Sequence, residues 1–591
     1  MMKFLKYMLA TITGIFISTI ILVLIFFGII SAIVSSTKDK QVFVKENTVL
    51  HIKLDKEITD RASNNPFEGM SLLSMKPETK LGLTDILENL EKAKSDPNIK
   101  GIYLDVSAVE AGPATIEEIR NALLDFKTSK KFIISYADYY TQGAYYLASV
   151  ADKIYLNPQG LIEFKGLNAE LMFYKGAIEK LGIEPQVIRH GKFKSAIEPF
   201  ILDKMSPENR EQTMTYMKSI WDHFIKGVSV QRSISVEDLN LYADSMTLRN
   251  AKIAVELKMA DGVKYKDEII AELKQLSGIA AEKELEIMSI GKYTNAPKTI
   301  DENKKIAKDR IAVIYATGQI DMGKGDSETI GSDGISEAIR KARLDKNVKA
   351  VVLRINSPGG SALASEVILR EVILTKKVKP VIASMGDVAA SGGYYIACAA
   401  DTIIASPTTI TGSIGVFGLM FNGKKLMNEK LGLTVDVVKT NAHSDIGTQF
   451  RAMTNDERNV IQHEVEQIYD VFITHVSEGR KIPKEQVDSV GQGRVWSGEN
   501  ALGIKLIDTY GGLNEAIKIA ARMAKITDYR IKSLPEQKEP FEQIMEQLSG
   551  DASVSVIRKE LGENYKYYKG IQNVLRMRGV QARLPYDIDI Y

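Results

Sequence analysis

Apolar and polar positions divide the chain into an uncharged N-terminal run and a long region of short apolar stretches alternating with helical ones. No charged residue occurs in residues 7–37, and residues 15–34 are mostly aliphatic or aromatic. About 20 such residues span a bilayer, whereas the apolar region of a cleavable signal has only about 7 to 15. The run therefore predicts an uncleaved transmembrane helix within residues 1–40, with cleavage near residues 31–36 as the alternative.

The charges that flank this run predict its orientation. Lys3 and Lys6 precede it together with the amino terminus, whereas Lys38 and Lys40 on the far side are partly cancelled by Asp39. Positive charge is retained on the cytoplasmic side of a membrane. We therefore expect a single-pass protein of the inner (cytoplasmic) membrane whose N-terminus is cytoplasmic and whose main part is extracytoplasmic.

After the anchor, short apolar runs alternate with helical stretches in a repeating order. Such alternation predicts parallel strands connected by helices that cover the sheet, which defines the α/β class. The expected elements are strand 99–106, helix 116–127 and strand 132–136, followed by strand 348–355, helix 366–376 and strand 381–385.

The two sets of elements belong to an internal repeat. Segments that begin at Asp96 and Tyr145 match segments that begin at Asp345 and Tyr394, and both pairs are 249 residues apart. Repetition at a constant spacing indicates duplicated folding units. We expect one domain at 41–300 and a second at 301–591, with a linker near 295–308 and a C-terminal helical extension that includes 541–548.

Composition excludes several classes of function. The 77 basic and 75 acidic residues are dispersed and leave a formal charge of +2, so no basic patch points to nucleic acid. The single cysteine, Cys398, excludes an intrachain disulfide and a cysteine-based zinc site, and its apolar neighbours place it in the core. The six histidines lack metal-binding spacing, so we expect no metal and no cofactor.

The richest chemical segment lies in the second copy. One predicted strand runs into Asn356-Ser-Pro-Gly-Gly-Ser361, and the next runs into Ala389-Ala-Ser-Gly-Gly-Tyr-Tyr395. Adjacent glycines let backbone N–H groups converge on an oxyanion, and Ser391 lies in a turn from which its hydroxyl can protrude. The alternative is a glycine-rich turn with a capping serine. In the first copy Gln142 replaces Ser391, so folding alone does not require that serine.

A serine nucleophile needs a base, and the sequence offers two kinds. In the second half, His443 with Asp445 would suggest a Ser-His-Asp arrangement, although closeness in sequence does not establish triad geometry. In the first half, the 249-residue offset aligns Lys194 with His443, and Lys192 lies on the same side of an extended segment. Alternation does not separate the two lysines, and a surface lysine is the ordinary alternative.

Four motifs resemble those of the long, tandem form of signal peptide peptidase A, also called protease IV. They are Lys194-Ser-Ala-Ile-Glu-Pro-Phe200, Asn356-Ser-Pro-Gly-Gly-Ser361, Ala390-Ser-Gly-Gly-Tyr394 and Thr411-Gly-Ser-Ile-Gly415. The resemblance covers nearly the whole chain after the anchor. It implies two tandem ClpP/crotonase-like domains, of which the first supplies a general-base lysine and the second supplies a nucleophilic serine.

The resemblance also implies roles for five residues. Ser391 matches the nucleophile, Lys194 the general base and Ser413 the serine that orients the lysine, while Gly360 and Gly392 match the oxyanion loop and turn. A lysine accepts a proton only when it is neutral, and its ordinary pKa is about 10.4. Burial lowers that pKa, so we expect Lys194 to be desolvated.

The implied function is a membrane-anchored Ser/Lys endopeptidase that degrades signal peptides left after secretory proteins are processed. The implied partners are remnant signal peptides and other apolar peptides, the membrane, and further copies of the chain in a homotetramer. Lys194 could meet Ser391 within one chain or between two chains. Two other classes stay open: a crotonase-like acyl-thioester enzyme, for which Ser391 would be unnecessary, and a noncatalytic membrane scaffold.

Overall fold

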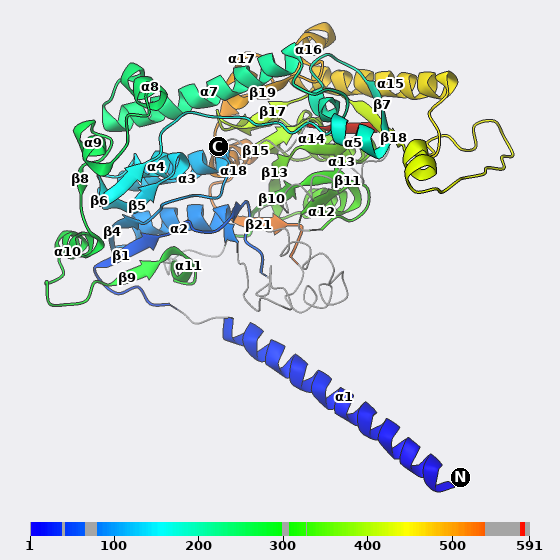
Figure 1. Ribbon diagram of the computed structural model, residues 1–591. Helices are drawn as coiled ribbons and strands as arrows, with labels where there is room; N and C mark the ends of the chain where they lie inside the picture. The colour runs from blue at the N-terminus through cyan, green and yellow to red at the C-terminus, as the bar shows by residue number, and fades with distance from the viewer. Residues whose placement is uncertain are drawn as a thin grey trace.

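The computed structural model describes residues 2–37, 42–64, 80–297, 307–326, 328–537 and 580–584. Apart from one long N-terminal helix, these residues form two units of strands and covering helices, which lie side by side in Figure 1. The α/β prediction is confirmed. The predicted C-terminal helix at 541–548, and residues 298–306 of the expected linker, lie outside the described residues.

The first unit is built on a six-stranded sheet in the order β8-β6-β5-β4-β1-β9, and each neighbouring pair is parallel. Helices cover the sheet, so its central strands are apolar along most of their length. The elements are β1 (Thr48–Ile52), β2 (Ile58–Thr59), β3 (Leu81–Gly82), α2 (Leu83–Ser95), β4 (Ile99–Leu104), α3 (Pro113–Lys127), β5 (Phe132–Tyr140), α4 (Gln142–Ala148), β6 (Lys153–Ile162), α5 (Lys175–Leu181), β7 (Glu184–Arg189), η1 (Ser195–Ile197), α6 (Glu198–Ile201), α7 (Pro207–Arg232), α8 (Val236–Asp244), α9 (Ala251–Glu256), β8 (Gly262–Val263), α10 (Lys266–Ser277), β9 (Ile287–Ser289) and α11 (Ile290–Tyr293).

The second unit repeats this plan around the order β19-β17-β15-β13-β10-β21, with β16 and β20 attached beside β15. The elements are β10 (Arg310–Thr317), β11 (Gln319–Asp321), β12 (Thr329–Gly331), α12 (Ser332–Leu344), β13 (Val348–Ser357), β14 (Gly359–Ser361), α13 (Ala362–Lys376), β15 (Val381–Ala390), α14 (Gly392–Ala397), β16 (Thr402–Ala405), β17 (Ile410–Gly412), β18 (Phe417–Asn422), η2 (Leu426–Lys430), α15 (Asn455–Arg480), α16 (Lys484–Val490), β19 (Val495–Ser497), α17 (Gly498–Gly503), β20 (Thr509–Tyr510), α18 (Leu513–Ala524), β21 (Arg530–Leu534) and β22 (Val580–Arg583).

The repeat is visible in the elements, but its spacing changes along the chain. Helices α3 and α13 have the same length and begin 249 residues apart, at Pro113 and Ala362. Further on, Gly182 and Gly432 each follow the sequence Glu-Lys-Leu and both have left-handed backbones, with φ of 75° and 67°. The offset is therefore 250 residues at this point. It aligns Lys194 with Ser444, which corrects the alignment with His443 that the constant spacing predicts.

A third sheet joins the two units. Its order is β12-β11-β14-β22-β18-β7, and every strand except β7 belongs to the second unit. Strand β7 crosses over from the first unit and pairs with β18 in antiparallel register, from Arg189 opposite Phe417 to Glu184 opposite Asn422. The residues that follow β7 are thereby delivered to the second unit.

Buried charges also connect the units. The Arg354 guanidinium on β13 is fully buried and contacts Asp60 and Glu118 of the first unit, each at 2.7 Å. On neighbouring β15, Asp387 accepts hydrogen bonds from the Ala114 and Thr115 N–H groups at the start of α3, at 2.8 and 2.9 Å. Removing one partner of such a buried group leaves an uncompensated charge, which costs several kcal/mol. These contacts therefore hold the two units in one arrangement.

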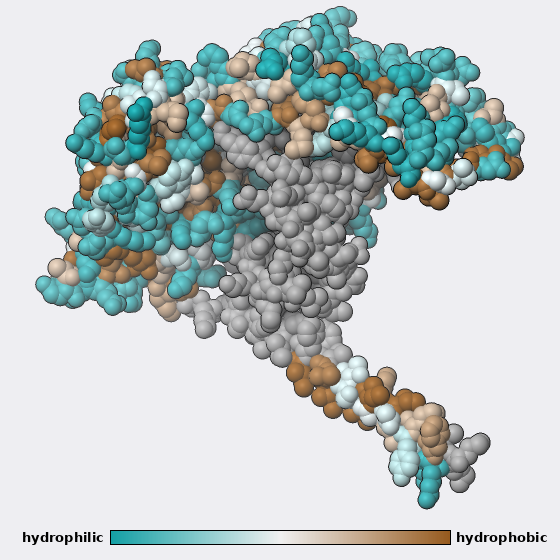
Figure 2. Space-filling view, in the orientation of Figure 1, coloured by the Kyte–Doolittle hydropathy of each residue, from teal (hydrophilic) through white to brown (hydrophobic). Residues whose placement is uncertain are grey.

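Helix α1 (Met2–Thr37) lies apart from both units and extends away from them in Figure 1. Hydrophobic residues line much of its drawn length in Figure 2, and the large apolar side chains from Phe4 to Ile25 that are described are exposed. Within the described part of the chain, none of the helices combines the length and the apolar character that crossing a membrane requires.

Candidate active site

Ser391 lies in a strained turn between β15 and α14. Its φ of 53° and ψ of −113° are unusual for a residue with a side chain. The turn is held from both sides, because the Ser391 N–H donates to the Gly412 carbonyl and the Tyr395 N–H donates to the Ser391 carbonyl, both at 2.8 Å. The backbone is thus fixed so that the hydroxyl projects from the end of the strand.

Lys194 reaches this hydroxyl from the first unit. Five residues after β7 ends, its Nζ lies 2.8 Å from Ser391 Oγ. The same Nζ lies 3.0 Å from Ser413 Oγ and 3.2 Å from the Ser413 carbonyl oxygen. Ser391 Oγ also lies 3.4 Å from the Gly415 carbonyl oxygen. The structure thus brings together Ser391, Lys194 and Ser413, and it does so within one chain.

The Lys194 amine is buried without a counter-ion. Lys194, Ser391 and Ser413 are all 0% exposed. Within the described part of the chain, no carboxylate lies at ion-pair distance from Lys194 Nζ; its polar neighbours are the two serines. Burial disfavours the ammonium form and holds the pKa of Lys194 well below its usual range. The site therefore favours a neutral amine beside a serine hydroxyl.

The lysine-bearing loop is held by residues that the sequence did not single out. Gly493 has a φ of 79°, and a Cβ there would lie only 2.6 Å from Lys194 Cβ. The Gln212 amide on α7 donates to the Phe193 carbonyl and to Ser195 Oγ, and its oxygen accepts from the Val495 N–H. A side chain at position 493 would displace Lys194. The only signal in the sequence is the short run Gly491-Gln-Gly493.

The two glycine motifs of the second unit are in contact. Gly359 has a φ of 97°, and a Cβ there would lie 2.7 Å from the Gly392 nitrogen and 2.1 Å from the Ala582 carbonyl oxygen. Next to it, Gly360 lies in β14 opposite Ala582 of β22. The predicted oxyanion residues Gly360 and Gly392 thus lie beside the Ser391 turn, and the C-terminal strand β22 runs along the same place.

Strand β22 fills the space between β14 and β18. It pairs with β14 in antiparallel register and with the start of β18, where Phe417 lies opposite Gln581. Ala582 is 0% exposed, and the Leu584 N–H donates to the Pro358 carbonyl at 2.7 Å. The space between β14 and β18 therefore accommodates an extended backbone with a small side chain at position 582.

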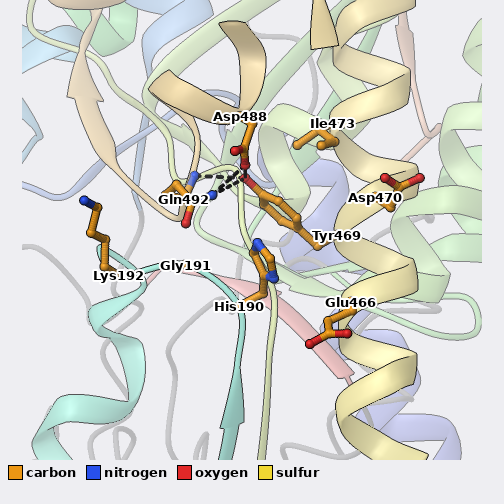
Figure 3. Close-up of a pocket in the computed structure, with 9 residues that line it drawn as sticks. All are labelled: His190, Gly191, Lys192, Glu466, Tyr469, Asp470, Ile473, Asp488 and Gln492. Atoms are coloured by element: carbon orange, nitrogen blue, oxygen red, sulfur yellow. Dashed lines mark hydrogen bonds between the residues drawn. The ribbon is translucent and has the colours of Figure 1, made fainter. Parts of the chain in front are cut away.

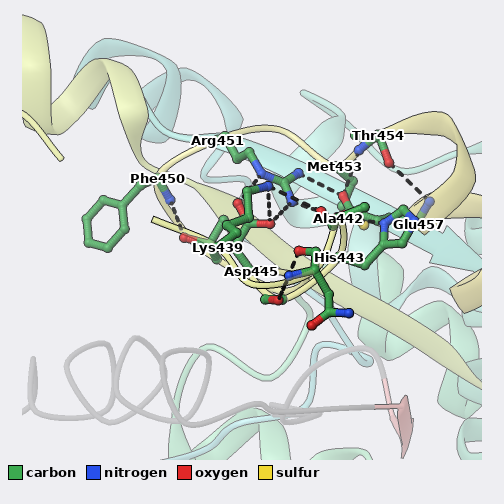
Figure 4. Close-up of polar contacts among 12 residues, drawn as sticks. Lys439, Ala442, His443, Asp445, Phe450, Arg451, Met453, Thr454 and Glu457 are labelled. Atoms are coloured by element: carbon green, nitrogen blue, oxygen red, sulfur yellow. Dashed lines mark hydrogen bonds and ion pairs between the residues drawn. The ribbon is translucent and has the colours of Figure 1, made fainter. Parts of the chain in front are cut away.

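The structure separates the other candidates from this site. Lys192 is exposed and lines a surface cavity of about 550 Å³ with His190, Tyr469 and Gln492, to which neither Lys194 nor Ser391 contributes (Figure 3). His443 is exposed, and its Nδ1 lies 3.8 Å from Glu457 Oε1. Asp445 pairs with Arg451 and Lys439 (Figure 4). The Ser-His-Asp alternative therefore does not form.

Cys398 lies in the core of the second unit. It is fully buried, and burial raises its thiol pKa to about 12, so the sulfur is a core group. Within the described residues, no group of three histidine, cysteine, aspartate or glutamate side chains could hold a metal ion.

Comparison with known proteins identifies the class. The sequence profile of peptidase family S49 matches residues 125–280 and again 373–527. The chain is 35% identical over 548 residues to the Arabidopsis thaliana "Serine protease SPPA, chloroplastic", covering 92% of this chain and 78% of that protein. It is 36% identical over 477 residues to "Protease 4" of Salmonella typhi, covering 79% and 76%. It is also 34% identical over 238 residues to the "Putative signal peptide peptidase SppA" of Enterococcus faecium, covering 39% and 68%.

These matches define a serine-type peptidase rather than a thioester enzyme or a scaffold. The chain belongs to peptidase family S49 and carries the S49 domain twice, so the resemblance to the long, tandem form is confirmed. Among solved structures, a mutant of the 1510-N membrane-bound stomatin-specific protease, in complex with a substrate peptide, overlaps 41% of this chain and 99% of its own, with a TM-score of 0.27 and 15% identity.

Replacing Lys194 with Met should change how stability depends on pH. Because burial lowers the folded-state pKa of Lys194, the unfolded chain binds the extra proton at every pH between that value and about 10.4, and stability rises with pH across this window. We expect Lys194→Met to have the larger free energy of unfolding near pH 7 and to lose this advantage, by up to about 1.4 kcal/mol per pH unit, as the pH approaches 10. Denaturant unfolding at several pH values measures the difference.

The matched control is Lys192→Met, which removes an exposed amine two residues away. Its free energy of unfolding should change with pH in the same way as that of the unmodified chain. A Lys194→Met difference that stays constant between pH 7 and pH 10 would mean that the amine remains protonated in the folded protein.

Proposed function

We propose that the chain is a membrane-anchored serine endopeptidase that degrades signal peptides with a Ser391–Lys194 dyad and works as a homotetramer. The observation that carries the proposal is the 2.8 Å contact between Lys194 Nζ and Ser391 Oγ in a buried site where none of the described carboxylates pairs with the lysine. A neutral lysine in contact with a serine hydroxyl is the arrangement in which the amine can accept the proton.

The hydrogen-bonding capacity of a neutral amine fits the three contacts of Lys194. A neutral amine has two N–H donors and one lone pair. The two donors can be used by Ser413, through its Oγ at 3.0 Å and its carbonyl oxygen at 3.2 Å. The lone pair then faces Ser391 Oγ. Ser413 thereby acts as the positioning residue that orients the base.

Catalysis follows the acyl-enzyme sequence. Lys194 accepts the Ser391 proton as Oγ attacks the peptide carbonyl carbon, and the carbonyl oxygen becomes an oxyanion that the Gly360 and Gly392 N–H groups stabilise. The Lys194 ammonium then returns the proton to the leaving amine, and the C–N bond breaks. Water attacks the ester after giving a proton to the neutral lysine. The bond between the acyl carbon and Ser391 Oγ then breaks, the proton returns to Oγ, and the acid product leaves.

Strand β22 supports a mode of substrate binding. It is antiparallel to β14 and β18, with Ala582 buried opposite Gly360 beside the Ser391 turn. A peptide that replaced β22 would add a strand between these neighbours and gain their backbone hydrogen bonds. Its residue at the place of Ala582 would have to be small. Small residues of this kind and apolar segments are features of signal peptides, and the Enterococcus faecium relative carries that activity in its name.

The membrane part of the proposal rests on α1. Residues 7–37 carry no charge, and the described large apolar side chains of this helix are exposed. With Lys3 and Lys6 on the cytoplasmic side, the catalytic units would be extracytoplasmic. The full chain should sediment with membranes after a carbonate wash, and a chain lacking residues 1–41 should stay in the supernatant. Co-sedimentation of both would assign membrane binding to another surface.

Replacement of either dyad residue should abolish hydrolysis of apolar peptides. We expect Ser391→Ala and Lys194→Met each to lower kcat/KM by about 10³-fold or more, because each removes a group required for nucleophilic attack. Lys192→Met and His443→Ala should retain near-full activity, since neither side chain contacts Ser391. Peptide hydrolysis and fluorophosphonate labelling of Ser391 measure these effects. Full activity in Lys194→Met, or its loss in His443→Ala, would refute the dyad.

Removal of the C-terminal strand should increase activity on short peptides. A chain ending at residue 579 lacks β22, so a substrate no longer has to displace that strand from its place between β14 and β18. We expect kcat/KM for a short apolar peptide to rise several-fold, chiefly through a lower KM. The control is Gln537→Ala, an exposed change before the C-terminal segment. Unchanged KM after truncation would place the substrate elsewhere.

A further inference from the structure

Each unit contains a segment that corresponds to β7 and a segment that corresponds to β18, but only one such pair forms a sheet contact among the described residues. In the first unit, the segment after Gly182 forms β7, which pairs with β18 of the second unit. The segment after Gly432, residues 433–438, has the corresponding sequence Leu-Thr-Val-Asp-Val-Val. We call residues 433–438 the distal arm.

The distal arm is apolar and exposed. Leu433, Val435 and Val437 are 52%, 45% and 47% exposed, and Val438 is 98% exposed. The Leu433 N–H donates to the Met427 carbonyl and the Val437 N–H donates to the neighbouring Asp436 carboxylate, but residues 433–438 form no strand pairing with any described residue. Unpaired backbone groups and exposed alternating apolar side chains are the features of a strand that lacks its neighbour.

The arm is nevertheless held in position at its base. Arg451 bridges Asp445 and Glu457, with nitrogen–oxygen distances of 2.6 to 2.8 Å, and Lys439 contacts Asp445 at 2.7 Å (Figure 4). Glu457 belongs to the first turn of α15. In Figure 1 the loop that contains the arm projects from the side of the second unit that lies farthest from β6. The base of this loop contacts Gly182 at the end of α5, and the loop extends from there away from the six-stranded sheet of the first unit.

The acceptor lies in the first unit, at residues 167–173, which we call the receiving segment. It contains Leu171-Met-Phe173, and the same three residues occur as Leu419-Met-Phe421 in β18, the strand that receives β7. The receiving segment has no secondary structure and makes no backbone hydrogen bond to any described residue. Met172 is 49% exposed. It is a β18 equivalent without a partner strand.

We propose that the distal arm of one copy pairs in antiparallel register with the receiving segment of a second copy, as β7 pairs with β18 within the chain. Within the chain, Val187 lies opposite Leu419 and Pro185 lies opposite Phe421. We apply the same register to the corresponding residues of the repeat. It places Val437 opposite Leu171 and Val435 opposite Phe173. Each pair joins two apolar side chains across neighbouring strands, which is the unit of sheet stabilisation.

This contact is head-to-tail, because the arm belongs to the second unit and the receiving segment to the first. A heterologous contact of this kind builds a ring when its rotation closes. The inference rests on the proposed assembly of several copies and names the surface that forms it. It adds no second dyad, since Ser444 aligns with Lys194 and Gln142 with Ser391. The contacts between copies would therefore be structural, and only the contact within each chain would be catalytic.

Disulfide cross-linking of the detergent-solubilised full chain tests the pairing. Leu171→Cys with Val437→Cys places two thiols directly opposite each other, at a separation that suits a disulfide. The native Cys398 is buried and does not compete. Mild oxidation should give a covalent ladder of dimers, trimers and larger species. The matched control, Leu171→Cys with Val438→Cys, directs the second thiol to the opposite face and should cross-link about ten-fold less.

A second variant tests the role of the distal arm without cross-linking. Val437→Asp should shift the sedimentation of the protein from the assembled form to the single chain, whereas Leu344→Asp, at a residue 71% exposed on α12, should not. An assembly that survives Val437→Asp and gives no register-specific ladder would overturn the arm pairing and leave the proposed assembly intact. A single chain before any substitution would overturn both. Fluorophosphonate labelling of Ser391 in the same samples reports on the proposed dyad independently.

Discussion

Burying the Lys194 amine beside Ser391 without a carboxylate is the constraint on which the other features of the site depend. Burial removes the amine from solvent and none of the described carboxylates pairs with it, so the surroundings favour its neutral form. Such burial requires close packing around a long side chain. Gly493 allows the backbone of the opposing loop to approach Lys194, and Gln212 ties that loop to the lysine-bearing one. The neutral state of the Lys194 amine therefore depends on the packing around it as well as on Lys194 and Ser391 themselves.

The two groups come from different units, so their 2.8 Å contact depends on how the units dock. The antiparallel pairing of β7 with β18 determines how far the lysine-bearing loop extends into the second unit, and the contacts of buried Arg354 and half-buried Asp387 fix the relative position of the sheets. A small displacement at this interface would separate the Lys194 amine from the Ser391 hydroxyl. Buried charges with several partners suit this task, because they are satisfied in one geometry and costly in others.

Much of this arrangement could be predicted from the sequence. Alternating apolar runs and matched segments predicted two α/β units. The family motifs predicted which serine and which lysine would lie together. Other features depend on contacts that sequence spacing does not encode. A constant offset aligned Lys194 with His443, but one extra residue in the second copy moves that position to Ser444. The pairing of β22 with β14 joins segments more than 200 residues apart, and neither Gly493 nor Gln212 belongs to a recognisable motif.

The placement of Lys194 and Ser391 in different units has a consequence for biosynthesis. A ribosome completes the lysine loop about 200 residues before it reaches Ser391, and the front half then contains an amine with no hydroxyl nucleophile to activate. When the serine turn emerges, it still lacks the amine until the rear half has folded and closed against the front. The Lys194 amine and the Ser391 hydroxyl therefore meet only after the second unit has been synthesised and has docked against the first, so the proposed dyad would form late in maturation.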